Sequence, residues 1–479
     1  MSWKLSAALV LAASLAGCAT NPVTGRPQLA LISESQEVQM GAQAAQEVQQ
    51  TIGLVDDAAL QQYVHGIGTR LAARSERPSL PWTFRVVDDP TPNAFALPGG
   101  YIFVTRGLLG LMEDEAELSS VLGHEIGHVT ARHQVTQISR AQLAQLGLGI
   151  GSILVPELQQ FGEVAGLGMN LLFLKYGRDA ENQADDLGFR YALTEGYDVR
   201  EMAEVFAALQ RVGEREGRSP LPSWLQTHPN PGERIRRTGE RVAALNRPLQ
   251  GLRVGEAEYL GRIDGLVYGE NPRNGFFRGG VFLHPDLRFR LDFPQGWRTQ
   301  NLPQAVVAVS PQQDAMIQLT LGQGSPDAAA QRFFSRQGLQ PGQAGRETVN
   351  GLPAVVGYFR AQTQQGVVDG VAAFVSHAGR TYEIVAFTPT GRFAPYDRLF
   401  RQTLGSFGPL TDPQALAAQP NRIDVVRLDR AMTLVEFNRR YPSAVPLAEL
   451  AVINGVEGET SPLPAGSLVK RVVPGTGTP

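Results

Sequence analysis

The stretch from Val121 to Val129 constrains this chain most, because it sets two histidines at helical spacing inside an apolar segment. It reads V-L-G-H-E-I-G-H-V, with His124 and His128 four residues apart. The neighbouring apolar residues recur with a helical period, which predicts a buried amphipathic helix from about Glu115 to Gln134. The spacing then places both imidazoles on one face of that helix, one turn apart.

Two neutral imidazoles at this spacing can hold one Zn²⁺, and Glu125 beside them can take a proton from a water at the metal. Two histidines packed in a helix interface are the alternative. A catalytic zinc site uses three protein ligands and a water, so a third ligand is needed. The candidates follow Tyr176 in a predicted helix, where the spacing alone does not choose among them: Asp179, Glu181, Asp185 and Asp186.

The length and composition indicate a multidomain globular protein. A chain of 479 residues predicts two to four domains, and 43% hydrophobic with 19% charged residues is typical of folded domains. The net charge of −3 gives no electrostatic case for binding nucleic acid.

The single cysteine, Cys18, follows a positive Lys4 and a short apolar run from Leu5 to Leu15. This pattern resembles a bacterial lipoprotein signal, which predicts a signal peptide over residues 1–17, lipidation of Cys18 and a membrane tether through the lipid. Ala19 after the cysteine predicts outer-membrane sorting, with the protein facing the periplasm. An ordinary secretory signal or a short anchor helix is the alternative, although the apolar run is too short to span a bilayer.

Several short sequence motifs taken together resemble those of the zinc metallopeptidases typified by the CAAX prenyl protease and the heat-shock protease HtpX, in their bacterial outer-membrane lipoprotein branch. The resemblance covers residues 21–240. It implies a mainly α-helical, zincin-like domain with a small sheet and one Zn²⁺ per chain. The matching words are Asn21–Arg26, Asn93–Thr105, His124–His128, Arg178–Asp185, and Thr227-His228-Pro229 with Arg234-Ile235.

The same resemblance assigns roles to the site residues. It makes His124, His128 and Glu181 the zinc ligands, Glu125 the catalytic base, and Asp185 the carboxylate that orients a ligand histidine. His228 and Arg234 lie near the metal in the family. His228 either donates a hydrogen bond to the developing oxyanion or fills the fourth zinc position in a resting state.

The stretch from Asn93 to Thr105 predicts a turn that leads into a strand. In zinc peptidases of this shape, an edge strand beside the metal pairs with the extended substrate, so we expect Asn93, Gly99, Gly100 and Tyr101 to contribute to substrate binding. An ordinary hairpin is compatible with the same pattern.

The remaining histidines carry no predicted chemistry. Because His133 lies about 140° round the predicted helix from His128, we expect it to be structural or solvent-facing. His65 lies on a predicted helix from Asp56 to Arg74, and His284 and His377 lie beyond the peptidase region.

The domain boundaries follow from breaks in the pattern. We expect a peptidase domain over residues 18–245, a linker over 246–277, an accessory α/β domain over 278–410, and a βααβ domain over 421–474. The accessory domain weakly resembles photosystem-accessory and nuclear-import-cofactor domains. The last domain resembles a lysin motif, which implies peptidoglycan contact, with a merely structural domain as the alternative. Residues 141–176 predict a helical hairpin or a mobile lid.

These features together predict a zinc-dependent endopeptidase of the bacterial cell envelope. Its expected substrates are misfolded or stalled periplasmic and outer-membrane proteins, by analogy with the family. The alternatives are a chaperone or scaffold that acts by binding, and a peptidase for peptidoglycan cross-links.

Overall fold

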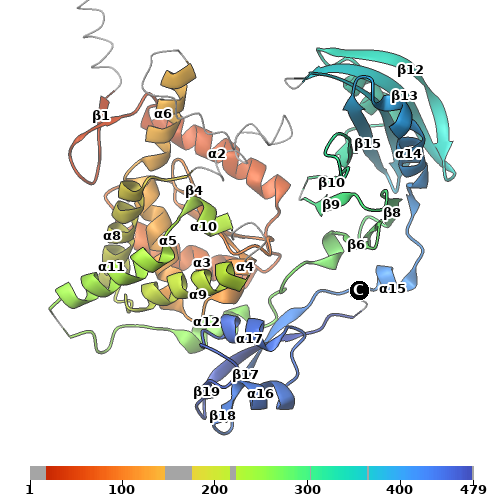
Figure 1. Ribbon diagram of the computed structural model, residues 1–479. Helices are drawn as coiled ribbons and strands as arrows, with labels where there is room; N and C mark the ends of the chain where they lie inside the picture. Colours follow the sequence, from red (N-terminus) through yellow and green to blue (C-terminus); the bar gives the residue numbers. More distant parts are fainter. Residues whose placement is uncertain are drawn as a thin grey trace, which may run out of the picture. The chain divides into compact units, whose positions relative to one another are not determined.

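The computed structural model describes residues 18–145, 175–215, 223–246, 248–302, 304–363 and 366–476 (Figure 1). The chain forms two compact units. The first comprises the residues up to Gly269 together with Arg422–Val473, and the second comprises Glu270–Asn421 with the residues from Pro474 onward. Among the described residues, no helix is long and apolar enough to cross a membrane. The predicted signal peptide and most of the predicted hairpin or lid lie outside the described residues.

The first unit begins with a short hairpin that holds the end of the motif helix. Strands β1 (Cys18–Thr20) and β2 (Pro27–Leu29) pair in antiparallel fashion. Asn21, which follows β1, and Gln28, which lies in β2, both donate side-chain hydrogen bonds to the carbonyl of Ala131.

Two helices follow close to their predicted bounds. Helix α2 (Glu34–Thr51) starts with the predicted capping box, in which Ser33 and Gln36 satisfy each other's backbone amides. Helix α3 (Ala58–Ala72) starts at Asp57, whose carboxylate accepts from the amide of Leu60.

A three-stranded sheet lies beside the motif helix. Its order is β3 (Thr83–Val87), β5 (Tyr101–Thr105), β4 (Ala94–Leu97), with β3 and β5 parallel. The turn between β4 and β5 requires Gly99, because its φ is +79° and a Cβ there would lie 2.6 Å from the Cα of Val38. Because β5 pairs with both β3 and β4, the strand that begins at Tyr101 is the central strand of this sheet and not an edge strand.

The motif helix is shorter than predicted. Helix α5 (Glu115–Thr130) has all of its residues buried, and α6 (His133–Gln145) begins after a break. The break occurs at Arg132, which has a φ of +56°. Its guanidinium bonds the buried carboxylate of Glu37 and the carbonyl of Ile32, so two buried contacts fix the residue where the helix ends.

Helix α8 (Arg178–Thr194) crosses α5 at very short range because both helices carry glycines at the crossing. A Cβ on Gly188 would lie 2.7 Å from the backbone nitrogen of His124, and one on Gly127 would lie 3.0 Å from the Cα of Ala184. This close approach brings the acidic face of α8 to the histidine face of α5.

The rest of the peptidase region is helical. Helix α4 (Arg106–Leu111) precedes α5, and the elements after α8 are α9 (Glu201–Arg215), α10 (Ser223–Thr227) and α11 (Pro231–Ala244).

The segment predicted as a linker contains a helix of the first unit's core. Helix α12 (Glu256–Ile263) buries Tyr259, Leu260 and Ile263 completely in the core that also contains α5. The prediction of a linker over residues 246–277 is therefore wrong for this helix.

The C-terminal residues of the first unit join the same core. Ile423 and Val452 pack into it, and the ammonium of Lys470 donates to the carbonyls of Gly110 and Met112. These residues belong to the same compact unit as α5 and also enclose a small core of their own, which includes Leu434, Phe437 and Leu450. The elements run in the predicted βααβ order, with a small extra pairing of β18 with β19: β17 (Arg422–Arg427), β18 (Met432–Thr433), α16 (Leu434–Arg440), α17 (Leu447–Ile453), β19 (Pro462–Leu463) and β20 (Leu468–Val473).

The second unit is an antiparallel seven-stranded sheet in the order β12-β13-β14-β15-β11-β10-β9, with a four-stranded sheet in the order β16-β8-β7-β6. Phe333 of α13 packs on one face of the larger sheet, and Phe400 of α14 packs on the other. Strand β12 has nearly all of its residues exposed, so its sequence lacks the alternation that predicts a half-buried strand.

The bounds in this unit are η2 (Pro272–Asn274), β6 (Phe276–Arg278), β7 (Val281–His284), β8 (Phe289–Asp292), β9 (Arg298–Asn301), β10 (Val306–Val309), β11 (Met316–Gly322), α13 (Pro326–Phe334), β12 (Leu339–Val349), β13 (Leu352–Thr363), β14 (Gly366–His377), β15 (Arg380–Pro389), α14 (Phe393–Ser406), β16 (Gly408–Pro409) and α15 (Pro413–Leu416).

Candidate metal centre

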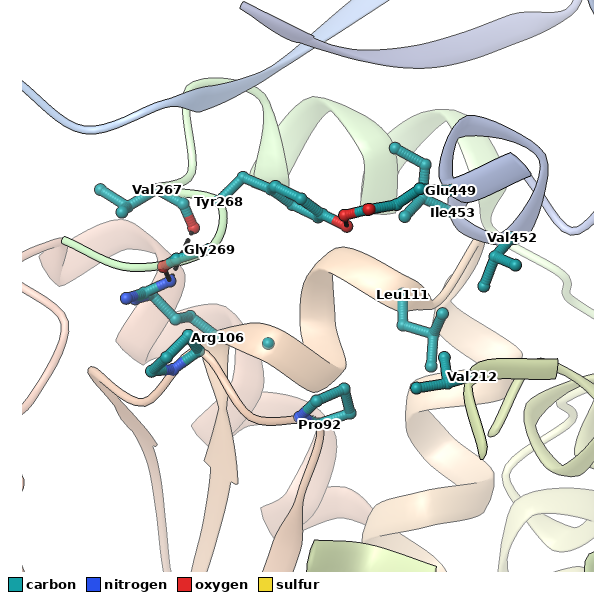
Figure 2. A pocket seen from close by; sticks show the side chains of 12 residues that line it. Pro92, Arg106, Leu111, Val212, Val267, Tyr268, Gly269, Glu449, Val452 and Ile453 are labelled. Atoms are coloured by element: carbon teal, nitrogen blue, oxygen red, sulfur yellow. Dashed lines mark hydrogen bonds between the residues drawn. The ribbon is translucent and has the colours of Figure 1, made fainter. Parts of the chain in front are cut away.

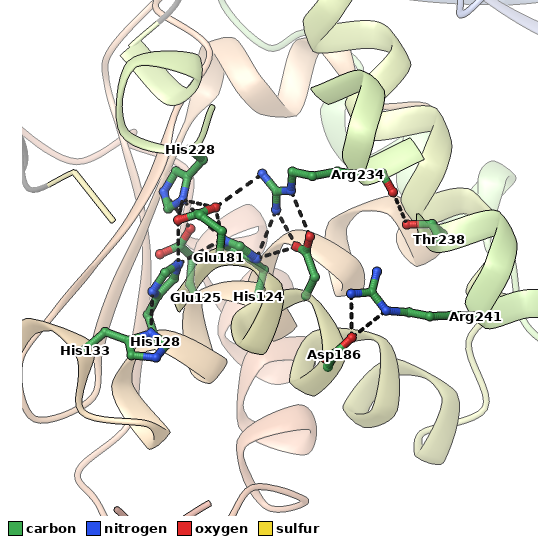
Figure 3. Close-up of polar contacts among 11 residues, drawn as sticks. His124, Glu125, His128, His133, Glu181, Asp186, His228, Arg234, Thr238 and Arg241 are labelled. Carbon is green, nitrogen blue, oxygen red and sulfur yellow. Dashed lines mark hydrogen bonds and ion pairs between the residues drawn. The ribbon is translucent and has the colours of Figure 1, made fainter. Parts of the chain in front are cut away.

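Four buried side chains converge between α5, α8 and the start of α11 (Figure 3). The Nε2 atoms of His124 and His128 lie 3.0 Å apart. The carboxylate oxygens of Glu181 lie 3.7 Å from the first of these nitrogens and 3.4 Å from the second. Of the candidate carboxylates, the structure therefore brings Glu181 to the inner side of both imidazoles.

His228 completes the group from the connection between α10 and α11. Its Nδ1 lies 3.2 Å from Nε2 of His124 and 3.0 Å from Oε1 of Glu181. The backbone there is fixed, because the amide of His228 donates to the carbonyl of Trp224 and Asn230 has a φ of +65°.

The donor set fits a tetrahedral metal ion. Zinc bonds of about 2.0–2.1 Å at tetrahedral angles place neighbouring donor atoms about 3.3 Å apart. The four donor atoms here all lie within 4.8 Å of one another, and His124 lies 3.0 Å from His128, 3.2 Å from His228 and 3.7 Å from Glu181. Imidazole lone pairs and carboxylate oxygens crowded this closely repel one another unless a cation lies among them. The buried residues His124, His128, Glu181 and His228 could therefore hold one divalent cation.

Glu125 lies beside this group and is not one of its donors. It is 1% exposed, and its Oε1 lies 3.6 Å from Nε2 of His228. That oxygen is buried and has no hydrogen-bond partner in the described structure, so it is available to a small polar molecule at the site.

The outer nitrogen of His124 faces a buried ion pair. Its Nδ1 lies 2.9 Å from Oδ1 of Asp185, and the guanidinium of Arg234 binds both oxygens of that carboxylate. The Arg234 guanidinium lies 4.1 Å from the centre of the Phe206 ring and 4.5 Å from that of Trp224. Arg234 therefore acts on the metal site through Asp185, as a positioning residue.

The outer nitrogen of His128 faces another histidine. Its Nδ1 lies 2.9 Å from Nδ1 of His133, whose Nε2 lies 3.0 Å from Oε1 of Gln183. His133 is structural, as expected, but it does not face solvent, since only 8% of it is exposed. The predicted position on a continuous helix does not apply, because α5 ends before this residue. The ring of Tyr176 stacks on His128 with centroids 3.9 Å apart.

Charges within the cluster shift several pKa values. Burial alone would raise the pKa of Glu181, but attraction from the neighbouring His228 holds it well below its usual value. Burial opposes ionisation of Asp185 too, and Arg234 and His124 nevertheless lower its pKa. Burial lowers the pKa of His128, and it lowers that of His133 to about 4. Both imidazoles are therefore neutral near pH 7.

His228 shifts in the opposite direction. Burial would lower its pKa, but the carboxylates of Glu181 and Glu125 raise it. This imidazole is the one in the cluster most disposed to carry a proton when no cation competes for its nitrogen.

The predicted substrate residues fall on two different strands. Asn93 directly precedes β4, Gly99 and Gly100 form the turn, and Tyr101 begins the central strand β5. Because β5 is paired on both sides, it cannot accept a peptide. Strand β4 has one partner in the sheet and packs against α5, so the unpaired edge of the sheet beside the motif helix belongs to Ala94–Leu97, and all four of these residues are buried. The assignment of the pairing strand to Tyr101 is wrong for this reason.

A second cavity of about 340 Å³ lies elsewhere in the first unit, between α4, α17 and residues 267–269 (Figure 2). Apolar side chains such as Pro92, Leu111 and Val452 form much of its wall. The hydroxyl of Tyr268 donates to the carboxylate of Glu449 at its rim. It shares no residue with the histidine cluster.

Residues 58–242, from the start of α3 almost to the end of α11, match peptidase family M48. The matched segment contains all four donor residues as well as Glu125, Asp185 and Arg234.

Relatives of the M48 domain occur in bacteria and mitochondria. The beta-barrel assembly-enhancing protease of Yersinia pestis is 31% identical over 224 residues, which is 45% of each chain. The mitochondrial metalloendopeptidase OMA1 of Arabidopsis thaliana is 32% identical over 197 residues, 40% of this chain and 38% of that protein. The chain spans about half the length of the curated relatives it matches. Among solved structures, cyanobacterial PsbP from Synechocystis matches 28% of this chain at 15% identity, with a TM-score of 0.24.

Proposed function

We propose that this protein is a zinc-dependent endopeptidase. The observation that carries the proposal is the buried cluster of three imidazoles and a carboxylate, whose donor atoms lie within 4.8 Å of one another, inside the segment that matches peptidase family M48. His124, His128 and Glu181 would hold the metal, one ion per chain. Zn²⁺ bound there would polarise a peptide carbonyl and lower the pKa of water.

Glu125 is placed to move the proton. Its buried, unpartnered oxygen can accept a proton from the attacking water and later return it to the leaving amine. A carboxylate in this position is neither a ligand nor tied up in an ion pair within hydrogen-bond distance, so it remains free for both steps.

Two roles are possible for His228: a hydrogen-bond donor to the oxyanion, or an occupant of the fourth zinc position in a resting state. Its position supports the second role. Because its Nδ1 occupies the fourth corner of the donor set, it would exclude water from the metal in this conformation. The ring would have to move aside before hydrolysis, after which it could donate to the developing oxyanion.

The proposed substrates are unfolded or misassembled envelope proteins. The support is the similarity to relatives named for enhancing β-barrel assembly, together with the position of β4 at the edge of the small sheet, beside α5. The proposed location is the periplasmic face of the outer membrane, through a lipid on Cys18. Peptidoglycan contact through residues 421–474 stays a prediction.

Replacing Glu125 with Gln tests the proposal. The carboxamide keeps the size of the side chain but cannot accept the proton, so casein cleavage should fall by about 100-fold or more while zinc binding persists. Retained cleavage would overturn the peptidase reading. If the variant still rescued an envelope defect fully, a chaperone role would be favoured, and digestion of purified sacculi by the unaltered protein would favour a cell-wall substrate.

A further inference from the structure

The outer side of His128 carries a partner that the peptidase mechanism above does not use. When Nε2 of a neutral imidazole binds a metal, the ring proton sits on Nδ1 and needs an acceptor. The atom in front of Nδ1 of His128 is Nδ1 of His133, at 2.9 Å. That nitrogen can accept only if it carries no proton itself.

The contact between Gln183 and His133 indicates which ring nitrogen of His133 carries the proton. Its Oε1 lies 3.0 Å from Nε2 of His133, and a carbonyl oxygen can only accept. The proton of His133 therefore sits on Nε2, which leaves Nδ1 free to accept from His128. One arrangement of protons satisfies all three side chains, and it points the lone pair of His128 toward the donor cluster.

We propose that His133 is a positioning residue for His128, held in its accepting form by Gln183. The inference rests on the proposed function, since it concerns how the chain presents a ligand to zinc. Both residues are tied to the site by the fold, because Gln183 lies between Glu181 and Asp185 on α8, and His133 follows the fixed break at Arg132.

The two ligand histidines are thus supported by chemically different partners. The partner of His124 is a carboxylate, that of Asp185, which forms an ion pair with Arg234. A divalent cation and Arg234 together balance the three buried carboxylates Glu125, Glu181 and Asp185. A further carboxylate behind His128 would leave an unbalanced negative charge in a buried site, whereas a neutral imidazole does not.

The test is the affinity of the full chain for zinc, measured by competition with a chromophoric chelator in a Glu125→Gln background. His133→Ala should weaken zinc binding by about 10- to 100-fold. His133→Asn should restore most of the affinity, because its amide oxygen can stand where Nδ1 stood and accept the same proton. A merely structural role for the ring predicts no such rescue.

Two further variants keep the outcome decisive. His65→Ala is the matched control, since His65 is a part-buried histidine of the same unit whose ring contacts Phe84 and not the donor cluster. Gln183→Leu should weaken zinc binding by several-fold and serves if His133→Ala fails to fold.

The outcomes separate this inference from the proposed function. If His124→Ala abolishes zinc binding while His133→Ala and Gln183→Leu bind like the parent, the positioning role is overturned and the zinc site stands. If His124→Ala itself binds zinc like the parent, the proposed function fails. Weakened binding in His133→Ala with rescue by His133→Asn supports the inference.

Discussion

The two units of this protein treat buried charge differently. In the described part of the second unit, the buried polar side chains are hydroxyls such as Ser310 and Thr388. The first unit buries carboxylates, guanidiniums, imidazoles and an ammonium, most of them paired. Burying a charge destabilises a fold unless an opposite charge or a hydrogen bond compensates for the lost hydration. The first unit therefore loses some stability by burying its charged side chains, whereas the second has an ordinary apolar core.

The largest expected effect falls on the metal centre. Glu181→Ala removes one of three proposed ligands and should weaken zinc affinity by at least about 100-fold. In the second unit, His284 is also buried enough that its pKa is lowered to about 4, but its described polar contact is with the amide of Leu287. His284→Ala should leave zinc affinity unchanged. Equal loss in both variants would erase the contrast between the units.

The next effect concerns the C-terminal residues of the first unit. Lys470 is fully buried, lies 3.0 Å from Glu113 and bonds two carbonyls at the end of α4. Lys470→Met should lower the free energy of unfolding by about 3 kcal/mol, because it leaves these acceptors and the carboxylate unanswered. Urea denaturation of the full chain measures this.

The matched change in the second unit is Arg346→Met. Arg346 pairs with Asp327 at the surface, so its loss should leave the free energy of unfolding nearly unchanged. If Lys470→Met proved as mild as this variant, the C-terminal elements would not be integral to the first unit.

A smaller effect depends on pH. Burial raises the pKa of Asp114, the N-cap of α5, to about 7, with Glu201 and Glu113 adding to the shift and the amide of Glu117 opposing it. A group whose pKa is raised by folding stabilises the fold fully below its unfolded pKa, near 4, and loses this contribution as pH rises through 7. From pH 5.5 to 8.5 the loss should be on the order of 2 kcal/mol.

Asp114→Asn isolates this contribution, because Asn keeps the oxygen that accepts from the amide of Glu117 and cannot ionise. The difference in unfolding free energy between pH 5.5 and 8.5 should shrink in the variant. An identical difference in both proteins would show that Asp114 does not titrate in this range.

The sequence predicted the inner side of the metal centre better than its outer side. The four-residue spacing of His124 and His128 needs only local helical geometry, and the family resemblance chose Glu181. The contact between His133 and His128 was not predicted, because one left-handed residue at Arg132, held by contacts with Glu37 and Ile32, ends the helix there. No local pattern encodes such a tertiary contact.

The predicted domain boundaries were limited in the same way, because a sequence pattern does not show contacts between distant parts of the chain. In the second unit, strands such as β8 and β11 alternate buried and partly buried residues, a pattern that a sequence shows directly. The linker was wrong because the burial of Tyr259 in α12 depends on packing against elements far away in the chain. The close crossing of α5 and α8 was missed for a similar reason, since the need for Gly123 and Gly188 appears only when the two backbones meet.

The central claim is that one zinc ion is bound by the imidazoles and carboxylate gathered between α5, α8 and α11. X-ray absorption at the zinc edge, on protein loaded with one equivalent, tests it most directly. The account predicts about four nitrogen and oxygen neighbours near 2.0–2.1 Å, with the outer-shell scattering of at least two imidazoles. A shell of six oxygens with no imidazole scattering, unaltered in His124→Ala, would contradict it.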